Sequence, residues 1–302
     1  MKGIVLAGGK GTRLYPLTLA MSKQLLPIYN KPMIYYPLSI LMLAGIREIL
    51  MIADPDNLAS YQALLGDGSH LGIEISYIVQ TEARGHVDGL LLGADFLDGE
   101  PVCFIFGDNV IYGHGVSGKV KDAAKLNDGA QIFAYPVRDP ERFGVVEFTP
   151  DGRVLSIEEK PARPRTHYAI PGIYFYDSNV INLARQVKPT ARNNELEITE
   201  LNKLYMAQNN LRVEMLGRGV AWLDAGTHAS LLEASNFVQA VENRQGLMIA
   251  CLEEIAYLMG YISRQEILAL AAPMKNEYGD YIRRIVEEVD QNGAEQSSSE
   301  IL

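Results

Sequence analysis

The sequence predicts an α/β protein with a mixed, mostly parallel central sheet flanked by helices, a small β-rich layer and C-terminal helices. Three observations support this prediction. Short apolar runs alternate with segments of helical periodicity in the first third of the chain, which is typical of parallel strands joined by helices. Between residues 130 and 177 the pattern changes to short β-rich pieces with turns, and after residue 246 it becomes helical.

The first predicted strand, at 3–6, runs directly into the glycine-rich segment GGKGTRL at 8–14. Glycines let a backbone approach a phosphate closely, and successive amide N–H groups together with Arg13 supply the complementary charge. The spacing matches neither GxxxxGK[ST] nor GxGxxG, the two commonest phosphate loops. Taken alone, the segment indicates a tight turn as readily as a site for a nucleoside triphosphate.

Three more apolar runs, at 48–53, 74–79 and 102–106, are predicted to be strands of the same sheet, and a helix is predicted at 34–44 before the first of them. In open α/β sheets, ligands bind beyond the carboxyl ends of the strands. We therefore expect the chemistry-bearing residues to follow these runs directly.

The segment 143–148, followed by a turn at 150–153, is typical of the β-rich part and is expected to belong to an antiparallel layer attached to the sheet. Helical segments are predicted at 253–257 and 264–268, and we expect them to pack on the core or on another subunit. The polar residues 291–302 are expected to form a disordered tail.

Composition limits the class of protein. The 302 residues are 48% hydrophobic, which is enough for a full core. No apolar run approaches the ~20 residues of a membrane span and no signal-peptide pattern is seen, so the expected location is the cytoplasm. The net charge of −10 argues against binding nucleic acid through a broad basic face. Cys103 and Cys251 lie in apolar contexts without metal-ligand spacing and are expected in the core.

Two aspartates lie where a ligand could bind. Asp108 follows the strand at 102–106, and Asp224 lies in the segment WLDAGT at 222–227. Together they could hold one Mg²⁺, a hard cation that accepts a few carboxylates and completes its shell with water and phosphate oxygens. Each aspartate taken alone is more typical of a helix or turn cap.

Two lysines join Arg13 as cations that folding could gather around a polyphosphate. They are Lys23, in SKQLLP at 22–27, and Lys160, in EEKP at 158–161. Each lysine taken alone is more often a solvated surface group. Phosphoryl and nucleotidyl transfer need charge neutralisation and alignment, and no protein nucleophile. This fits the sequence, in which the five histidines show no metal spacing and no Ser/His/Asp or Cys/His set stands out.

In order along the chain, seven segments resemble the motifs of the sugar nucleotidyltransferases. They are GGKGTRL at 8–14, SKQLLP at 22–27, FGDN at 106–109, FGVVE at 143–147, EEKP at 158–161, ELEIT at 195–199 and WLD at 222–224. The resemblance covers nearly the whole chain and is strongest to the short-form glucose-1-phosphate thymidylyltransferases. It implies a Rossmann-like nucleotidyltransferase fold.

The resemblance also implies a division of the chain. A nucleotidyltransferase core would span 1–242, with a nucleotide-binding part at about 1–129 and a sugar-binding part at about 130–242. A C-terminal helical region at 243–290 would carry the oligomeric and regulatory surfaces. A homotetramer is implied, with the helices after Gly246 at one interface.

The implied reaction is an in-line attack of glucose 1-phosphate on the α-phosphorus of dTTP, giving dTDP-glucose and pyrophosphate with Mg²⁺ as cofactor. In the family this is the first step of dTDP-rhamnose-type sugar biosynthesis. Two alternatives stay open: a uridylyltransferase acting on a hexose 1-phosphate, and a sugar-nucleotide-binding regulator without turnover. The C-terminal region has no hexapeptide repeat, which argues against a fused acyltransferase arm.

Carried over by position, the resemblance assigns roles to individual residues. Asp108 and Asp224 would bind Mg²⁺, Arg13 and Lys23 would hold the triphosphate, and Lys160 would grip the sugar phosphate. The residues surrounding the nucleotide would be Leu6, Gly8, Gly9, Gly11, Thr12, Arg13, Lys23, Gln24, Gln80, Gly85 and Asp108, with Gln80 hydrogen-bonding the pyrimidine edge. The sugar pocket would be lined by Gly144, Glu159, Lys160, Ile170, Tyr174 and Glu195.

On the nucleotide side, the sequence departs from the family pattern after Gln80. The family commonly has PSPDGLAQAF there, and this chain has TEARGHVDGL at 81–90. The change introduces His86, in place of an apolar residue beside the expected base and sugar, and Asp88; some relatives do carry Arg-Gly and an Asp in this stretch. The choice between dTTP and UTP therefore stays open.

Three further departures concern the sugar pocket and the C-terminal region. Phe143 replaces a usual tyrosine, which removes one hydroxyl from the sugar pocket, and Asn193-Asn194 replaces a usual Arg-Gly turn. Leu258 stands where many relatives have an arginine, at a secondary nucleotide site between subunits that is linked to feedback inhibition. Without that cation, an anionic inhibitor is expected to bind there more weakly.

Overall fold

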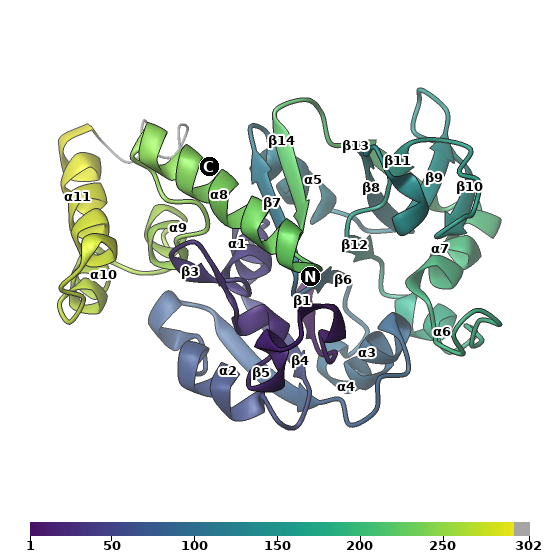
Figure 1. Ribbon diagram of the computed structural model, residues 1–302, viewed down its shortest axis with the longest axis horizontal. Helices are drawn as coiled ribbons and strands as arrows, with labels where there is room; N and C mark the ends of the chain where they lie inside the picture. Colours follow the sequence, from purple (N-terminus) through teal and green to yellow (C-terminus); the bar gives the residue numbers. More distant parts are fainter. Residues whose placement is uncertain (293–302) are drawn as a thin grey trace.

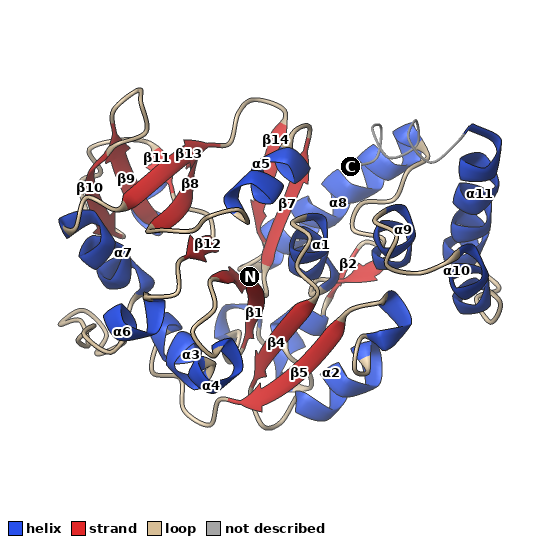
Figure 2. Cartoon of the chain, turned by 180° about the vertical axis from the view of Figure 1, so that it is seen from behind, coloured by secondary structure: helices blue, strands red, loops and turns tan. Residues whose placement is uncertain are grey.

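The computed structural model describes residues 1–292, so the predicted tail at 291–302 lies almost wholly outside the described residues. A ten-stranded sheet forms the centre of this part of the chain, in the order β10-β9-β11-β8-β12-β6-β1-β4-β5, with β13 paired to β8. Helices α10 and α11 lie at one end of the molecule, and β9 and β10 lie at the opposite end (Figures 1 and 2).

The strands of the central sheet are β1 (Lys2–Ala7), β4 (Glu48–Ala53), β5 (Glu74–Val79), β6 (Val102–Phe106), β8 (Ala130–Pro136), β9 (Gly144–Phe148), β10 (Val154–Glu159), β11 (Tyr168–Ala169), β12 (Ile173–Tyr176) and β13 (Leu211–Met215). Two small antiparallel pairs lie outside it, β2 (Pro27–Ile28) with β3 (Lys31–Pro32) and β7 (Asn109–Gly113) with β14 (Val220–Asp224). The helices are α1 (Tyr35–Leu43), α2 (Leu58–Leu65), α3 (His86–Leu92), α4 (Ala94–Leu97), α5 (Val116–Ala123), α6 (Val180–Ala184), α7 (Ile198–Ala207), α8 (His228–Gln245), α9 (Leu252–Leu258), α10 (Arg264–Ala271) and α11 (Glu277–Asn292).

The mixed α/β prediction is confirmed. The four predicted apolar strands are β1, β4, β5 and β6, and they pair in parallel in the order β5-β4-β1-β6. The β-rich segment is antiparallel as predicted and continues the same sheet, because β12 pairs with both β6 and β8. The other parallel pair is β8 with β13. One hydrogen-bonded sheet therefore runs through both parts of the core.

Strands β1, β4 and β6 are buried on both faces, which explains why they read as nearly continuous apolar runs, whereas the edge strand β5 is only partly buried. In β1, Val5 packs in one core cluster and Ile4 in the other, because successive side chains point to opposite faces of a sheet. Met51 and Leu50 of β4 divide in the same way. Helices α1, α2 and α5 cover the first face, with α9 packed on α1 and α10 and α11 packed on α9, and α3, α4, α6 and α7 cover the second face.

Helix α8 is anchored to the core by a buried ion pair near its C-terminal end. Helix α8 begins with a capping box between Thr227 and Ser230. Near its end, Glu242 Oε1 lies 2.8 Å from Nζ of Lys31, which is 2% exposed. The predicted helical segments are confirmed as α9 and α10, and Cys103 and Cys251 are both buried and free, as expected. Among the described residues, no helix combines the length and the hydropathy needed to cross a membrane.

Glu254 of α9 is a buried carboxyl group with incomplete hydrogen bonding. It is 1% exposed, and Tyr281 donates its hydroxyl hydrogen to Oε2 at 2.6 Å. Its Oε1 has no hydrogen-bond partner among the described residues. Burial raises the pKa of Glu254 to about 8, because removal from water disfavours the charged form.

We expect this group to make the protein less stable as the pH rises from 4.5 to about 8. Over this window the folded protein keeps a proton on Glu254 that the unfolded chain has lost, so its contribution to the free energy of unfolding falls by up to about 1.4 kcal/mol per pH unit. Glu254→Gln should flatten the dependence in urea denaturation between about pH 5 and about pH 8. Glu277→Gln, on the exposed start of α11, should leave it unchanged; equal slopes for the wild type and Glu254→Gln would contradict the assignment.

Candidate active site

The glycine loop after β1 turns sharply into a short 3-10 helix, Thr12–Leu14. Gly9 and Gly11 have φ values of 109° and 54°, in the left-handed region that side chains disfavour. Thr18 donates its hydroxyl hydrogen to the Gly11 carbonyl oxygen at 2.8 Å, which holds the turn. The turn brings Arg13 to the edge of a cavity next to the carboxyl end of β6.

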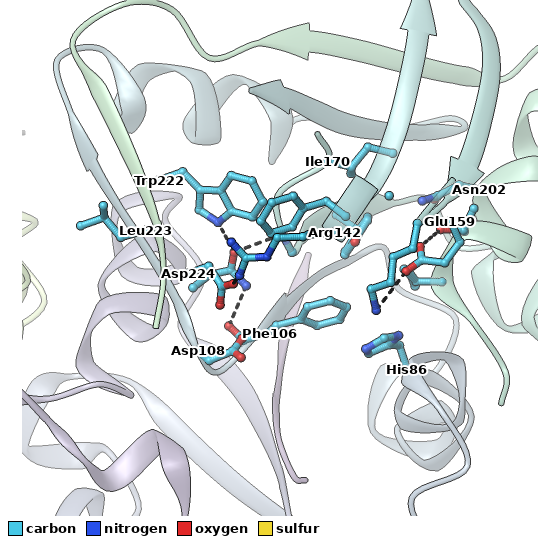
Figure 3. A pocket seen from close by; sticks show the side chains of 18 of the residues that line it. His86, Phe106, Asp108, Arg142, Glu159, Ile170, Asn202, Trp222, Leu223 and Asp224 are labelled. Atoms are coloured by element: carbon cyan, nitrogen blue, oxygen red, sulfur yellow. Dashed lines mark hydrogen bonds and ion pairs between the residues drawn. The ribbon is translucent and has the colours of Figure 1, made fainter. Parts of the chain in front are cut away.

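This first cavity has a volume of about 240 Å³ and is lined by charged and aromatic side chains from both parts of the core (Figure 3). Its lining is Arg13, His86, Phe106, Asp108, Asn109, Arg142, Phe143, Gly144, Glu159, Lys160, Ile170, Gly172, Tyr174, Ile198, Thr199, Asn202, Trp222, Leu223 and Asp224. Eight predicted site residues are therefore together: Arg13, Asp108, Gly144, Glu159, Lys160, Ile170, Tyr174 and Asp224.

The pairing of β7 with β14 explains how two distant aspartates meet. Asp224 lies opposite Asn109 in the antiparallel register, which puts it next to Asp108. The Asn109 Oδ1 accepts hydrogen bonds from the Trp222 indole at 2.8 Å and from the Gly172 amide at 3.1 Å. Asn109 of the FGDN motif thus connects Trp222 to Gly172 through hydrogen bonds, while the two aspartates face the cavity.

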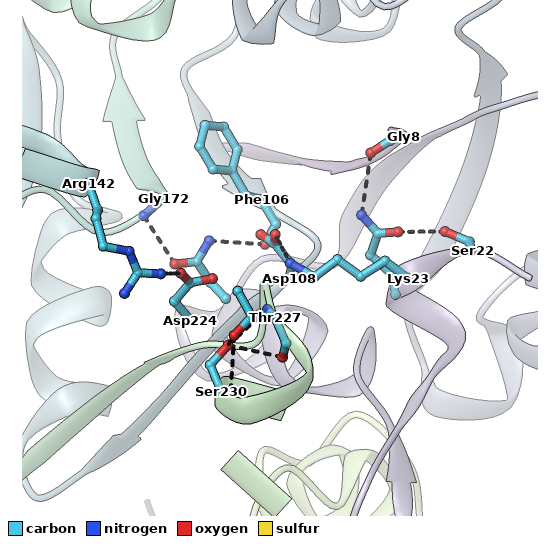
Figure 4. Close-up of polar contacts among 12 residues, drawn as sticks. Gly8, Ser22, Lys23, Phe106, Asp108, Arg142, Gly172, Asp224, Thr227 and Ser230 are labelled. Carbon is cyan, nitrogen blue, oxygen red and sulfur yellow. Dashed lines mark hydrogen bonds and ion pairs between the residues drawn. The ribbon is translucent and has the colours of Figure 1, made fainter. Parts of the chain in front are cut away.

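Each aspartate is held by a cation (Figure 4). Lys23 Nζ lies 2.6 Å from Asp108 Oδ2, and Arg142 Nη2 lies 2.8 Å from Asp224 Oδ2. Burial opposes the charge on Asp108, but the Lys23 ammonium outweighs it and holds the pKa of this carboxyl below its usual range. The Asp108 and Asp224 side chains keep 34% and 25% exposure, so each carboxylate can still bind a ligand.

Arg13 reaches the same group of charges. A Cβ at Gly226 would lie 2.7 Å from Asp224 Oδ1 and 3.0 Å from Arg13 Nη2, so both side chains converge on this glycine. Gly226 follows β14 directly and leaves room for them only because it has no side chain. The turn after β14 therefore brings Arg13 beside the aspartates.

On the opposite wall, Glu159 and Lys160 follow one another at the end of β10. Thr199 donates its hydroxyl hydrogen to Glu159 Oε2 at 2.5 Å, and Lys160 Nζ lies 3.5 Å from Glu159 Oε1. Phe143, which replaces the usual tyrosine, packs against Trp222 with ring centroids 5.0 Å apart. This wall offers hydrogen-bonding groups beside flat aromatic surfaces, an arrangement that suits a ligand with several hydroxyl groups.

A buried Glu197 network, which the motifs did not predict, supports this wall. His86 stacks on Phe106 with ring centroids 4.4 Å apart, and its Nδ1 lies 3.4 Å from Glu197 Oε2. Arg192 and Asn193 each donate to Glu197 Oε1 at 2.7 Å. Burial opposes the charge on Glu197, but contacts with His86, Asn193 and Arg192 outweigh it and lower its pKa to about 2.

The glycine loop also borders a second cavity, of about 470 Å³, whose lining includes Gly8, Gly9, Ser22, Asn57 and Gln80. Gln24 lies beneath the loop: it accepts a hydrogen bond from the Ser22 hydroxyl at 2.5 Å and donates to the Gly8 carbonyl oxygen at 3.4 Å. The structure thus has two cavities at the glycine loop. The first contains the charged side chains, and the second lies beside Gly8 and Gly9.

The remaining predicted residues lie outside the lining of both cavities; they are Leu6, Gly11, Thr12, Lys23, Gln24, Gly85 and Glu195. Lys23 acts at the first cavity through Asp108. Gly85 packs against the backbone of Leu196, where a Cβ would come within 2.5 Å of the amide nitrogen. Glu195 accepts a hydrogen bond from Asn193 at 2.9 Å, and the buried glutamate of the ELEIT motif is Glu197.

Sequence reasoning missed Arg142, Asn202 and the aromatic wall of Phe106 and Trp222. Arg142 directly precedes the FGVVE motif, and Trp222 begins the WLD motif, so their positions beside predicted site segments were the available signal. Nothing in the sequence around Asn202 indicates that it lines a pocket, because it lies in the apolar pattern of α7.

Comparison with known proteins agrees with this geometry. The profile of the nucleotidyl transferase family matches residues 2–241, which span both cavities. This chain belongs to the nucleotidyl transferase family. A curated family member, the glucose-1-phosphate thymidylyltransferase of Neisseria meningitidis serogroup A, is 54% identical over 287 residues, covering 95% of this chain and 99% of the relative.

Two solved structures are similar to this nucleotidyl transferase family member. One is a Bacillus anthracis chain described as a glucose-1-phosphate thymidylyltransferase, in complex with sucrose, with 38% identity and a TM-score of 0.72; the match covers 78% of this chain and 94% of that one. The other, a UDP-glucose pyrophosphorylase complexed with UDP-glucose, is 22% identical with a TM-score of 0.70, covers 81% and 99% of the two chains, and shows the fold alone.

Proposed function

We propose that this protein transfers a thymidylyl group from dTTP to glucose 1-phosphate, producing dTDP-glucose and pyrophosphate. The observation that carries the proposal is the meeting of Arg13, Lys160, Asp108 and Asp224 in one cavity beside a glycine loop. The high identity to a curated thymidylyltransferase over nearly the full length of both chains supports the choice of substrates.

In this reaction, a phosphate oxygen of glucose 1-phosphate forms a bond to the α-phosphorus of dTTP. The bond from that phosphorus to the oxygen bridging to the β-phosphate breaks, and pyrophosphate leaves with the electron pair. Such a transfer depends on alignment and charge stabilisation by the protein. The balance of atoms requires no side chain to form a covalent intermediate.

The proposed roles follow from the positions of the charged groups. Arg13, at the end of the glycine loop, lies where it can stabilise charge on the triphosphate, and the loop amides can bind phosphate oxygens. Lys160 on the opposite wall is placed to bind the sugar phosphate. Lys23 positions Asp108 through their ion pair. Its ammonium group can turn from Asp108 toward the leaving pyrophosphate.

Asp108 and Asp224 would hold Mg²⁺, and the donor set suits this ion. Both carboxylates face the cavity, and among residues 1–292 no group of three or more His, Cys, Asp and Glu side chains is arranged to hold a metal. Mg²⁺ is usually bound by one or two carboxylates, with phosphate oxygens and water completing its shell. When bound, Mg²⁺ would neutralise phosphate charge between the two substrates.

The direct test is pyrophosphate release with glucose 1-phosphate and Mg²⁺, comparing dTTP and UTP at matched concentrations. We expect faster release with dTTP. A preference for UTP above about tenfold would replace the nucleotide assignment, since that corresponds to roughly 1.4 kcal/mol in the transition state. Binding of dTDP-glucose without pyrophosphate release from any nucleotide would instead identify a regulator without turnover.

We also propose that the protein is a homotetramer with the helices after Gly246 at one interface. The resemblance to the short-form enzymes supports this proposal, and sedimentation velocity at micromolar concentration tests it.

We propose that the protein is located in the cytoplasm, which is consistent with its two free buried cysteines.

A further inference from the structure

We infer that Asp88 is a positioning residue that fixes the orientation of the Gln80 amide and thereby selects the nucleotide by its base edge. The inference rests on the proposed function, since it takes the second cavity as the nucleoside site. It assigns a role to one of the residues at which this chain departs from the family pattern.

The contact that carries the inference joins the end of β5 to the first turn of α3. Gln80 follows β5 and lines the second cavity beside Gly8 and Gly9. Its Nε2 donates a hydrogen bond to Asp88 Oδ2 at 2.8 Å. Asp88 is 9% exposed and is not part of the cavity lining, so it acts on a ligand only through Gln80.

The chemistry of this contact determines which way the amide faces. A carboxylate can only accept hydrogen bonds, so it must face the Nε2 of Gln80 and not the Oε1. The position of Oε1 is consistent with this orientation. It lies on the side of Gly8, where a Cβ built on the glycine would be 3.0 Å from Oε1. The acceptor of Gln80 is therefore held against the glycine loop, on the side of the cavity.

Held in this way, Gln80 presents an acceptor, Oε1, next to the second hydrogen of Nε2. Thymine and uracil present the complementary pair, an N3–H donor beside a carbonyl oxygen. Cytosine and adenine present a ring-nitrogen acceptor beside an exocyclic amino donor. To pair with them, the amide would have to turn over and bring Oε1 against the Asp88 carboxylate.

Turning the amide over would replace a hydrogen bond by two acceptors facing each other in a largely buried place. This is the costly case, because both groups then lack a partner. The glutamine at the corresponding position of the family pattern can donate as well as accept, so it would permit both orientations. The rejection of cytosine and adenine nucleotides by this mechanism is thus a property of Asp88.

The test is equilibrium binding of dTTP and dCTP, by calorimetry, to the wild type and to Asp88→Asn. An asparagine can donate to a turned amide, so the ratio of the two affinities should fall by about tenfold or more, while dTTP binding changes by less than about threefold. Asp95→Asn, which removes an exposed carboxylate from the first turn of the neighbouring α4, should leave the ratio unchanged.

A double-mutant cycle separates positioning from a general structural effect. In a Gln80→Ala background, Asp88→Asn should change the ratio by less than about twofold, because the group it acts through is gone. An equal change in both backgrounds, or an equal loss of dTTP and dCTP binding in Asp88→Asn, would overturn the inference. Failure of the proposed function is distinguishable, because it is read as absent turnover in the wild type.

Discussion

Replacing Asp108 with asparagine is expected to lower kcat at least about a hundredfold, equivalent to roughly 3 kcal/mol of transition-state stabilisation. The substitution removes one of the two aspartate carboxylates that would hold Mg²⁺ in the cavity. It also leaves the Lys23 ammonium, now 2.6 Å from a carboxylate oxygen, beside a neutral amide. Initial rates of pyrophosphate release at saturating substrates measure the effect.

The matched control is Asp122→Asn, which also removes an aspartate paired with a lysine at short range. Asp122 Oδ1 lies 2.7 Å from Lys125 Nζ on the exposed surface of the molecule. This variant should keep wild-type turnover. If Asp108→Asn kept it too, with an unchanged requirement for Mg²⁺, Asp108 would not belong to the metal site.

The largest expected loss of stability comes from Lys31→Met. Lys31 is almost fully buried, and its ammonium is paired with Glu242, which also accepts hydrogen bonds from the Asn30 side chain and the Ile249 amide, each at 2.8 Å. Removing the cation leaves a buried carboxylate without its counter-charge, which typically costs about 3–5 kcal/mol. Chemical denaturation followed by circular dichroism should report this loss in the free energy of unfolding.

Lys125→Met provides the comparison for this variant, since it breaks an ion pair whose two side chains are 75% and 72% exposed. Such a surface pair contributes about 0.5 kcal/mol or less. Two variants of equal stability would show that the Lys31–Glu242 pair does not hold α8 against the core.

The central strands of the parallel region could be predicted because a strand that is buried on both faces has apolar residues at consecutive positions. Strands β1, β4 and β6 read in this way, as Val102–Phe106 does, and the segments that follow them line the two cavities. The edge strand β5 is half-buried, and Ser76 interrupts its apolar run. The continuity of the sheet could not be predicted in this way. The pairing of β12 with β6 joins residues 68 to 74 positions apart, and no local pattern encodes it.

The same difference between local patterns and long-range contacts decides which site residues could be predicted from the sequence. Asp108, Asp224 and Arg13 could be proposed because they lie in recognisable motifs. The partner of Asp224 could not, because Arg142 is 82 residues away and pairs with it only when β9 is added to the sheet. The Glu197 network was missed for a related reason: ELEIT contains two glutamates, and only the fold decides which of them is buried.

The direct pairing of β12 with β6 means that the two parts of the core cannot be separated as independent fragments. A chain cut before Ala130 would leave β6 with an open row of amide and carbonyl groups, and such an uncovered edge invites association with other chains. For the same reason, the parts of the first cavity that come from β6, β9 and β10 belong to one hydrogen-bonded sheet. We therefore expect substrates to enter and products to leave through movements of side chains and loops, and not through a rotation of one half of the core against the other.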